Sequence, residues 1–124
     1  MHPIEYQALR KALGLSVEDV ARRFNKDRRT AQRWEVHNEP PAVVQAWILE
    51  RWGDFLDRVD DALQSAREME AEGKGEILEL PVYRSESRCI EETGLTHAGQ
   101  AALYGHIMLQ FDLADLPVLF VDVD

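Results

Sequence analysis

The chain has 124 residues, of which 45% are hydrophobic and 30% are charged, and its formal net charge is -9. This length suits one domain or two small ones, and the hydrophobic content is sufficient for a packed core. No apolar run approaches the roughly 20 residues of a membrane span, and the first residues, MHPIEYQALRK, lack the apolar core of a secretory signal. We therefore expect a cytoplasmic protein.

Residues 16–35 predict two short helices joined by a tight turn. Ser16 can cap the first helix, with Asp19 three residues later as its reciprocal partner. Asn25 stands where the chain must turn, and asparagine tolerates a left-handed backbone at a helix end. The apolar face of this first helix contains Val20, Ala21 and Phe24.

Asp27 can cap the second helix, which we expect over about 28–36. At 100° per residue, two groups of side chains separate on this helix. The expected packing side carries Thr30, Ala31 and Trp34. The expected exposed side carries Arg28, Arg29, Gln32 and Arg33.

The exposed side has side chains that suit the major groove of DNA. Arginine matches the O6 and N7 acceptors of guanine, and glutamine can pair with the N6 and N7 edge of adenine. Arginines on a surface helix are often only a solvated face. Here the neighbours favour DNA binding, because Ala21 is small where two helices must cross and Trp34 can close the bundle.

This stretch resembles the lambda-repressor-like (Cro/C1-type, XRE-like) helix-turn-helix regulators. Their typical string is close to LSxxxLAxxxxxSxxTxxRWE, and this chain has LSVEDVARRFNKDRRTAQRWE within a resemblance that covers about residues 5–38. The resemblance assigns the base contacts to Arg28, Arg29, Gln32 and Arg33. It also implies that Arg10 pairs with Glu35.

The sequence departs from the typical string in three places: Asn25 replaces a glycine, Val17 replaces a polar phosphate-contacting residue, and Val36-His37 replaces Asn-Gly. Backbone N–H groups at the start of the first helix, at Ser16 and Val17, can still hold a phosphate through the helix dipole. The side chains expected to contact phosphates are those of Arg22, Lys26, His37 and Asn38.

The charge distribution is compatible with a nucleic-acid partner despite the acidic total. Residues 1–40 contain eight Lys or Arg and six Asp or Glu, whereas residues 41–124 contain six and seventeen. Residues 20–34 contain six bases and one acid. The proposed reading helix is therefore locally positive, and the acidic remainder would orient that face toward DNA.

A long helix is expected over residues 42–70, after Pro40-Pro41 and without a further proline. Gly53 costs this helix up to about 1 kcal/mol relative to alanine, but we expect the helix to continue through it. We expect the helix to be a spine shared by both halves. Its apolar stripe contains Ile48, Trp52, Phe55, Val59, Ala62, Ala66 and Met69, widened by Val44, Leu56 and Leu63.

The C-terminal half predicts short strands and helices. Residues 77–83 have the β-branched and hydrophobic character of a strand, which Pro81 makes an edge strand or interrupts. A helical turn over 85–92 precedes Gly94, and Thr96 can cap a helix that runs to about Phe111. The tail, 116–123, reads as a strand that pairs with the first one.

These elements predict a mainly α fold with two parts, a DNA-binding bundle over 1–70 that includes the long helix and a small α+β dimerisation region over 71–124. The second part loosely resembles phage anti-CRISPR-associated repressors, which implies a homodimer built through it. A two-fold dimer would require an inverted-repeat operator with half-sites about 34 Å apart. The expected dimer contacts are Phe55, Val59, Leu63, Leu103, Ile107, Leu119 and Val121.

Catalytic and metal-binding patterns are poor. The four histidines are scattered without metal-ligand spacing, and the paired acids, such as Asp60-Asp61, point in different directions on a helix. Cys89 is the only cysteine, which excludes an intrachain disulfide, and a lone thiol beside Ile90 is usually a small buried hydrophobe. We expect no enzyme activity, no metal and no cofactor.

The sequence thus predicts a dimeric DNA-binding transcriptional regulator, and family habit favours a repressor. Two alternatives stay open. One is an antitoxin-like interaction module, in which the acidic half binds a basic protein partner. The other is an RNA-binding regulator that uses basic or aromatic residues outside the motif, for which Tyr83, Arg84 and Arg88 are the local candidates.

Overall fold

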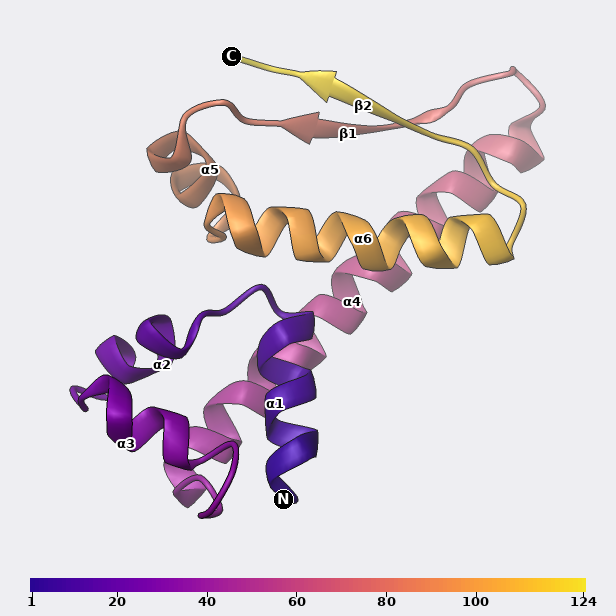
Figure 1. Cartoon of the computed structure of the whole chain (residues 1–124). Helices are drawn as coiled ribbons and strands as arrows, with labels where there is room; N and C mark the ends of the chain where they lie inside the picture. The colour runs from indigo at the N-terminus through magenta and orange to yellow at the C-terminus, as the bar shows by residue number, and fades with distance from the viewer. The chain divides into compact units, whose positions relative to one another are not determined.

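The structure is a computed structural model that describes residues 1–124 (Figure 1). It contains six helices and a two-stranded parallel sheet near the C-terminus, which confirms the expected mainly α class. The residues form two compact units, Met1–Phe55 and Leu56–Asp124. The division falls inside the long helix α4 (Ala42–Glu72), whereas the sequence places it after residue 70. None of the helices combines the length and the apolar character that a membrane span requires.

The N-terminal unit contains α1 (Pro3–Ala12), α2 (Val17–Arg23), α3 (Arg28–Arg33) and the first turns of α4. Pro3 occupies the first turn of α1, where a missing N–H group costs nothing, and the His2 side chain caps the helix by accepting from the Ile4 N–H. Apolar side chains from all four helices make the core. The buried members are Tyr6, Leu13, Val20, Ala21, Ala31, Trp34, Val44, Ile48 and Phe55.

Helix α4 is two residues longer than expected and continues through Gly53. Within each unit, the buried side chains of α4 recur with the 3.6-residue period, because side chains three or four positions apart share one side of a helix. Val44, Ile48, Val59 and Ala66 are buried, whereas Leu56, expected to widen the apolar stripe, is exposed.

The C-terminal unit contains β1 (Leu78–Val82), α5 (Glu86–Thr93), α6 (His97–Leu113) and β2 (Val118–Asp122). The two strands pair as expected, with Leu80 opposite Phe120. Their direction is parallel, which requires a long crossover, and α5 and α6 supply it. The sheet lies along α6, with α5 near one end (Figure 1).

Local signals set the boundaries of α5 and α6. Ser85 and Thr96 cap the two helices by accepting hydrogen bonds from the N–H groups of Arg88 and Gly99. Gly94 ends α5 with a φ of 75°, a left-handed conformation that glycine adopts without a steric penalty.

One face of the sheet packs against α6. The ring of Phe120 lies 5.6 Å from that of Tyr104, and the Tyr104 hydroxyl donates to the carbonyl of Pro81. Burial raises the pKa of the Tyr104 hydroxyl to about 12. Buried Leu80, Leu103, Ile107, Phe111 and Leu116 complete this core.

Candidate nucleic-acid interface

The two short helices α2 and α3 are positioned by the turn that the sequence predicts. Ser16 and Asp19 form the reciprocal capping box, with distances of 3.0 and 2.8 Å. Asn25 has a φ of 53°, and the Lys26 N–H closes the end of α2 by donating to the Ala21 carbonyl at 2.8 Å. Asp27 then caps α3 by accepting from the Thr30 N–H at 2.7 Å, and this bond holds the pKa of the Asp27 carboxyl below its ordinary value.

Helix α3 separates its buried and exposed sides as the residue spacing predicts. Ala31 is buried against α2, where Val20 and Ala21 are also buried, and Trp34 closes the end of α3. The helix ends at Arg33 rather than near residue 36, and residues 34–37 form turns. The exposed side chains are Arg28, Arg29, Gln32 and Arg33.

A buried ion pair ties α1 to the end of α3. The Nε and Nη2 atoms of Arg10 lie 3.1 and 2.9 Å from Oε1 of Glu35, and Nη1 donates to the Leu15 carbonyl at 2.7 Å. The two side chains are only 11% and 6% exposed. Burial, aided by the charge of Glu35, raises the pKa of the nearby Tyr6 hydroxyl to about 12. The pair implied by the family resemblance is therefore present, and it holds α3 against the bundle.

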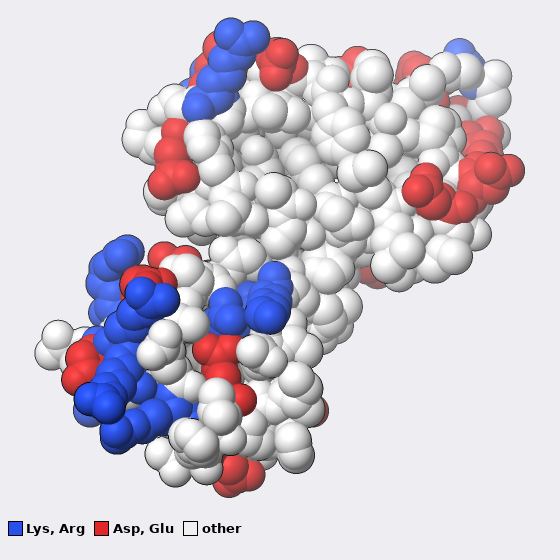
Figure 2. Space-filling model, viewed as in Figure 1, with Lys and Arg blue, Asp and Glu red and all other residues white.

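The exposed side of α3 is chemically available to a ligand. Arg29, Gln32 and Arg33 make no hydrogen bond or ion pair through their side chains, and with Val36 and His37 they line an open hollow of about 390 Å³. Arg28 instead pairs with Glu18 of α2, with its Nε 2.9 Å from the carboxylate. Lys and Arg side chains gather on the side of the unit that carries α2 and α3 (Figure 2).

The residues expected to contact phosphates stand in α2 and in the turns just before and just after α3. Ser16 and Val17 start α2, and Lys26 is exposed in the turn before α3. Arg22 is exposed, with its Nη1 3.8 Å from Asp19. His37 and Asn38 are exposed just after α3, where their N–H groups both donate to the Arg33 carbonyl at 2.9 Å.

The side chains expected at the dimer contact lie in different environments. Phe55, Val59, Leu103 and Ile107 are at most 8% exposed within the single chain, so they contribute to the core rather than to its surface. Leu63 and Val121 are half-buried. Leu119 alone among the seven is well exposed, because periodicity marks an apolar face without showing which element covers it.

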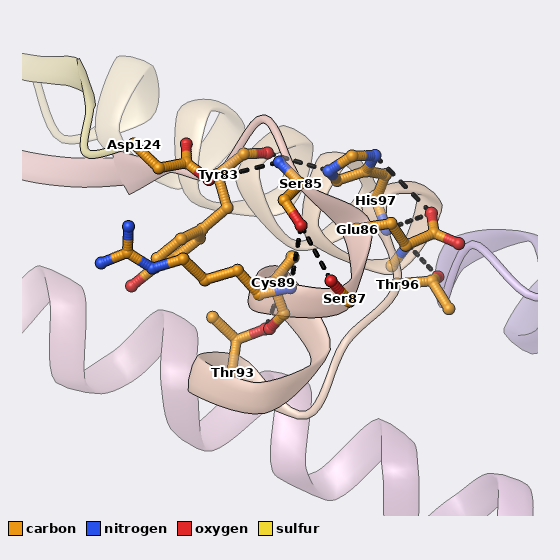
Figure 3. Close-up of polar contacts among 11 residues, drawn as sticks. Tyr83, Ser85, Glu86, Ser87, Cys89, Thr93, Thr96, His97 and Asp124 are labelled. Carbon is orange, nitrogen blue, oxygen red and sulfur yellow. Dashed lines mark hydrogen bonds and ion pairs between the residues drawn. The ribbon is translucent and has the colours of Figure 1, made fainter.

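A second polar cluster joins the end of β2 to the start of α5 (Figure 3), and the sequence named its Tyr83, Arg84 and Arg88 but not their meeting with Asp124. The Asp124 carboxylate accepts from the backbone N–H groups of Arg84 and Ser85 at 2.7 and 3.2 Å. These two hydrogen bonds lower the pKa of the Asp124 carboxyl, and the bond from the Arg84 N–H has the larger effect. The Arg88 side chain donates to the Val123 carbonyl and lies over the ring of Tyr83.

The serine, histidine and carboxylate in this cluster do not form a catalytic triad. His97 directs Nε2 to the Tyr83 carbonyl at 2.8 Å, and its Nδ1 lies 3.6 Å from Glu86. The Ser85 hydroxyl contacts Ser87 and the Arg88 N–H instead (Figure 3). A nucleophile needs a base within hydrogen-bond reach, and the serine has none here. No group of three His, Cys, Asp or Glu side chains is arranged to hold a metal ion.

Comparison of the sequence with protein-family models and with curated proteins finds no match.

Proposed function

We propose that this protein is a sequence-specific DNA-binding transcriptional regulator that inserts α3 into the major groove. The observation that carries the proposal is the division of α3 into a buried side and an exposed side with three arginines and a glutamine. The N-terminal half of such a helix reaches base edges while the preceding helix crosses the backbone. Arg28 and Arg29 stand at the start of α3, and Gln32 and Arg33 stand one turn later on the same side.

The supporting electrostatics are local. The Asp27 cap is the only acid among residues 20–34, and its carboxylate is engaged by the Thr30 N–H. Arg28 must exchange its pairing with Glu18 for a base or phosphate when DNA arrives. This exchange is inexpensive because both side chains are solvated, and exposed ion pairs contribute only about 0.2–1 kcal/mol.

We further propose that the protein acts as a homodimer and represses transcription by occluding a promoter. Helix α6 supports the dimer, because it is apolar on nearly its whole circumference although one face is not covered by the chain. Leu109 and Leu113 are 56% and 75% exposed. The other exposed residues on this side of α6 are Ala98, Ala101, Gly105 and Met108, with Asp112 as its one charged member.

No observation favours either alternative function. Arg84 and Arg88, two of the three residues considered for RNA binding, have their side chains directed at Asp122 and at the Val123 carbonyl, and Tyr83 lies under Arg88. The acidic surface of the C-terminal half has no feature that selects a basic protein partner over solvent.

Selection from a random duplex DNA pool tests the proposal. The purified wild type should select an inverted repeat at a salt concentration of about 0.15 M, chosen because phosphate contacts are salt-dependent. Arg28→Ala and Gln32→Ala should each relax particular base positions at a cost of about 1–3 kcal/mol. Arg67→Ala, an exposed arginine in the other unit, is the matched control and should leave the motif unchanged. Recovery of no motif with wild type would reject sequence-specific reading.

A further inference from the structure

A cluster of two arginines and two aromatic rings joins α2 to α4 within the N-terminal unit. The rings of Phe24 and Trp47 meet edge to face with their centroids 5.4 Å apart. The guanidinium carbon of Arg23 lies 5.3 Å from the Phe24 centroid and 5.9 Å from that of Trp47. The guanidinium carbon of Arg51 lies 4.6 Å from the Trp47 centroid. We call these four residues the arginine-aromatic cluster.

The aromatic rings orient the two guanidinium groups without consuming their hydrogen-bond donors. A cation–π contact consumes no N–H donor, so the planar fork of the guanidinium that matches a phosphate stays available. Phe24 and Trp47 are half-buried and so are fixed by packing, while Arg23 and Arg51 are exposed. Each arginine therefore loses less conformational freedom on binding an anion than an unstacked side chain would.

The charge environment of the cluster also favours an anionic ligand. Neither Arg23 nor Arg51 makes a hydrogen bond or an ion pair with a carboxylate, although the chain has 23 acids and 14 Lys or Arg. By contrast, Arg22 of α2 and Arg28 of α3 both contact acids. The cluster is thus a pair of preoriented cations whose charge the chain does not neutralise.

We propose that Arg23 and Arg51 bind phosphate groups of the DNA backbone beside the base pairs that α3 contacts. Arg23 is exposed in the last turn of α2, next to Arg22 and three residues before Lys26 in the sequence, so α2 and the turn after it carry three exposed cations. Arg51 of α4 belongs with them because its guanidinium and that of Arg23 contact the same Trp47 ring. This inference rests on the proposed DNA binding, but it concerns affinity for any duplex and not the choice of sequence, since phosphate contacts carry no base information.

The test is the salt dependence of duplex binding by Arg23→Gln, Arg51→Gln and the double variant. Each lost phosphate contact should make the slope of log K against log salt shallower by about 0.9. If a contact contributes nothing at about 1 M salt, this slope predicts that its loss lowers affinity near 0.15 M salt about fivefold. The loss of two contacts should lower affinity about thirtyfold. Arg67→Gln removes the same charge from an exposed position in the other unit and should change affinity less than twofold.

Two probes separate this proposal from that of sequence-specific reading. The variants should lose affinity for a random-sequence duplex as well as for a selected operator, and the selected sequence should stay the same. If wild type selects no sequence but the double variant still binds random duplex more weakly, the backbone contacts stand and base reading fails. If the double variant binds the random duplex and the operator as tightly as Arg67→Gln does, the cluster does not contact the DNA backbone. The same conclusion follows if the double variant binds both duplexes normally and loses affinity only for an RNA hairpin of equal length.

The role of the rings has its own test, in which the charge is kept. Trp47→Leu retains an apolar side chain but removes the ring that Arg23 and Arg51 share. The salt slope should then stay close to that of wild type while affinity falls by a fewfold, because the cations remain but are less ordered. Circular dichroism and thermal unfolding of each variant confirm that a loss of binding is not a loss of fold. Wild-type affinity in a folded Trp47→Leu variant would show that the rings do not orient the arginines for binding.

Discussion

At the scale of single residues, the position of α3 depends on side chains that lie away from its exposed face. Arg10 anchors Glu35 at the end of α3 and also holds the Leu15 carbonyl just before α2. One guanidinium therefore fixes both ends of the helix-turn-helix against α1. Because this pair is almost fully buried, losing one partner leaves a charge without compensation in a poorly solvated place.

We expect Glu35→Gln to lower the free energy of unfolding by about 3–5 kcal/mol, because Arg10 would keep its charge without an anionic partner. Urea unfolding at 25 °C, followed by circular dichroism, measures this change. Glu39→Gln is the control: Glu39 is exposed and contacts only the N-terminal amine at 3.4 Å, so it should cost less than about 1 kcal/mol. A loss below about 1 kcal/mol in Glu35→Gln would show that the buried pair contributes little.

At the scale of elements, caps and glycines decide where the helices end. Ser16, Asp27 and Thr96 each cap the helix that the sequence assigned to them, because a cap acts through neighbours two or three residues away. Gly53, in contrast, does not end a helix. It lies inside α4, and an added Cβ atom would meet no atom within 4 Å.

Gly53→Ala should therefore raise the free energy of unfolding by up to about 1 kcal/mol, since alanine has the higher helix propensity and no steric obstacle. Gly94→Ala is its counterpart, because its added Cβ atom also meets no neighbour but its φ of 75° strains any other residue. That variant should lower stability. Thermal and denaturant unfolding of both compare them directly, and a destabilised Gly53→Ala would indicate that α4 requires the flexibility of glycine.

At the scale of the whole molecule, the distribution of apolar surface is the basis of the proposed homodimer. The C-terminal unit buries Val59, Leu103 and Ile107 in its own core. It leaves the Leu109 side of α6 exposed, and a monomeric soluble protein rarely exposes a large contiguous apolar patch. Seventeen acids among residues 41–124 would oppose contact through most other surfaces, because like charges repel.

We expect Leu109→Asp to convert a dimer of the 14.2 kDa chain into a monomer, because two-fold symmetry would place two carboxylates in one apolar contact. Sedimentation velocity over a range of protein concentrations measures the change. Leu49→Asp is the matched control, since Leu49 is 50% exposed on α4 in the other unit and should leave the mass unchanged. A wild-type monomer at all concentrations, or a dimeric Leu109→Asp, would place no dimer contact on this face.

The sequence by itself determined the helix-turn-helix, its caps, the length of α4 within two residues and the pairing of two C-terminal strands. These features depend on side-chain period and on contacts between near neighbours, which the order of residues encodes directly. Only the tertiary structure decided the parallel direction of the strands, the burial of Val59, Leu103 and Ile107, and the meeting of Arg23 with Trp47. Each of these depends on which distant segment covers an apolar or aromatic surface, and period alone carries no information about that neighbour.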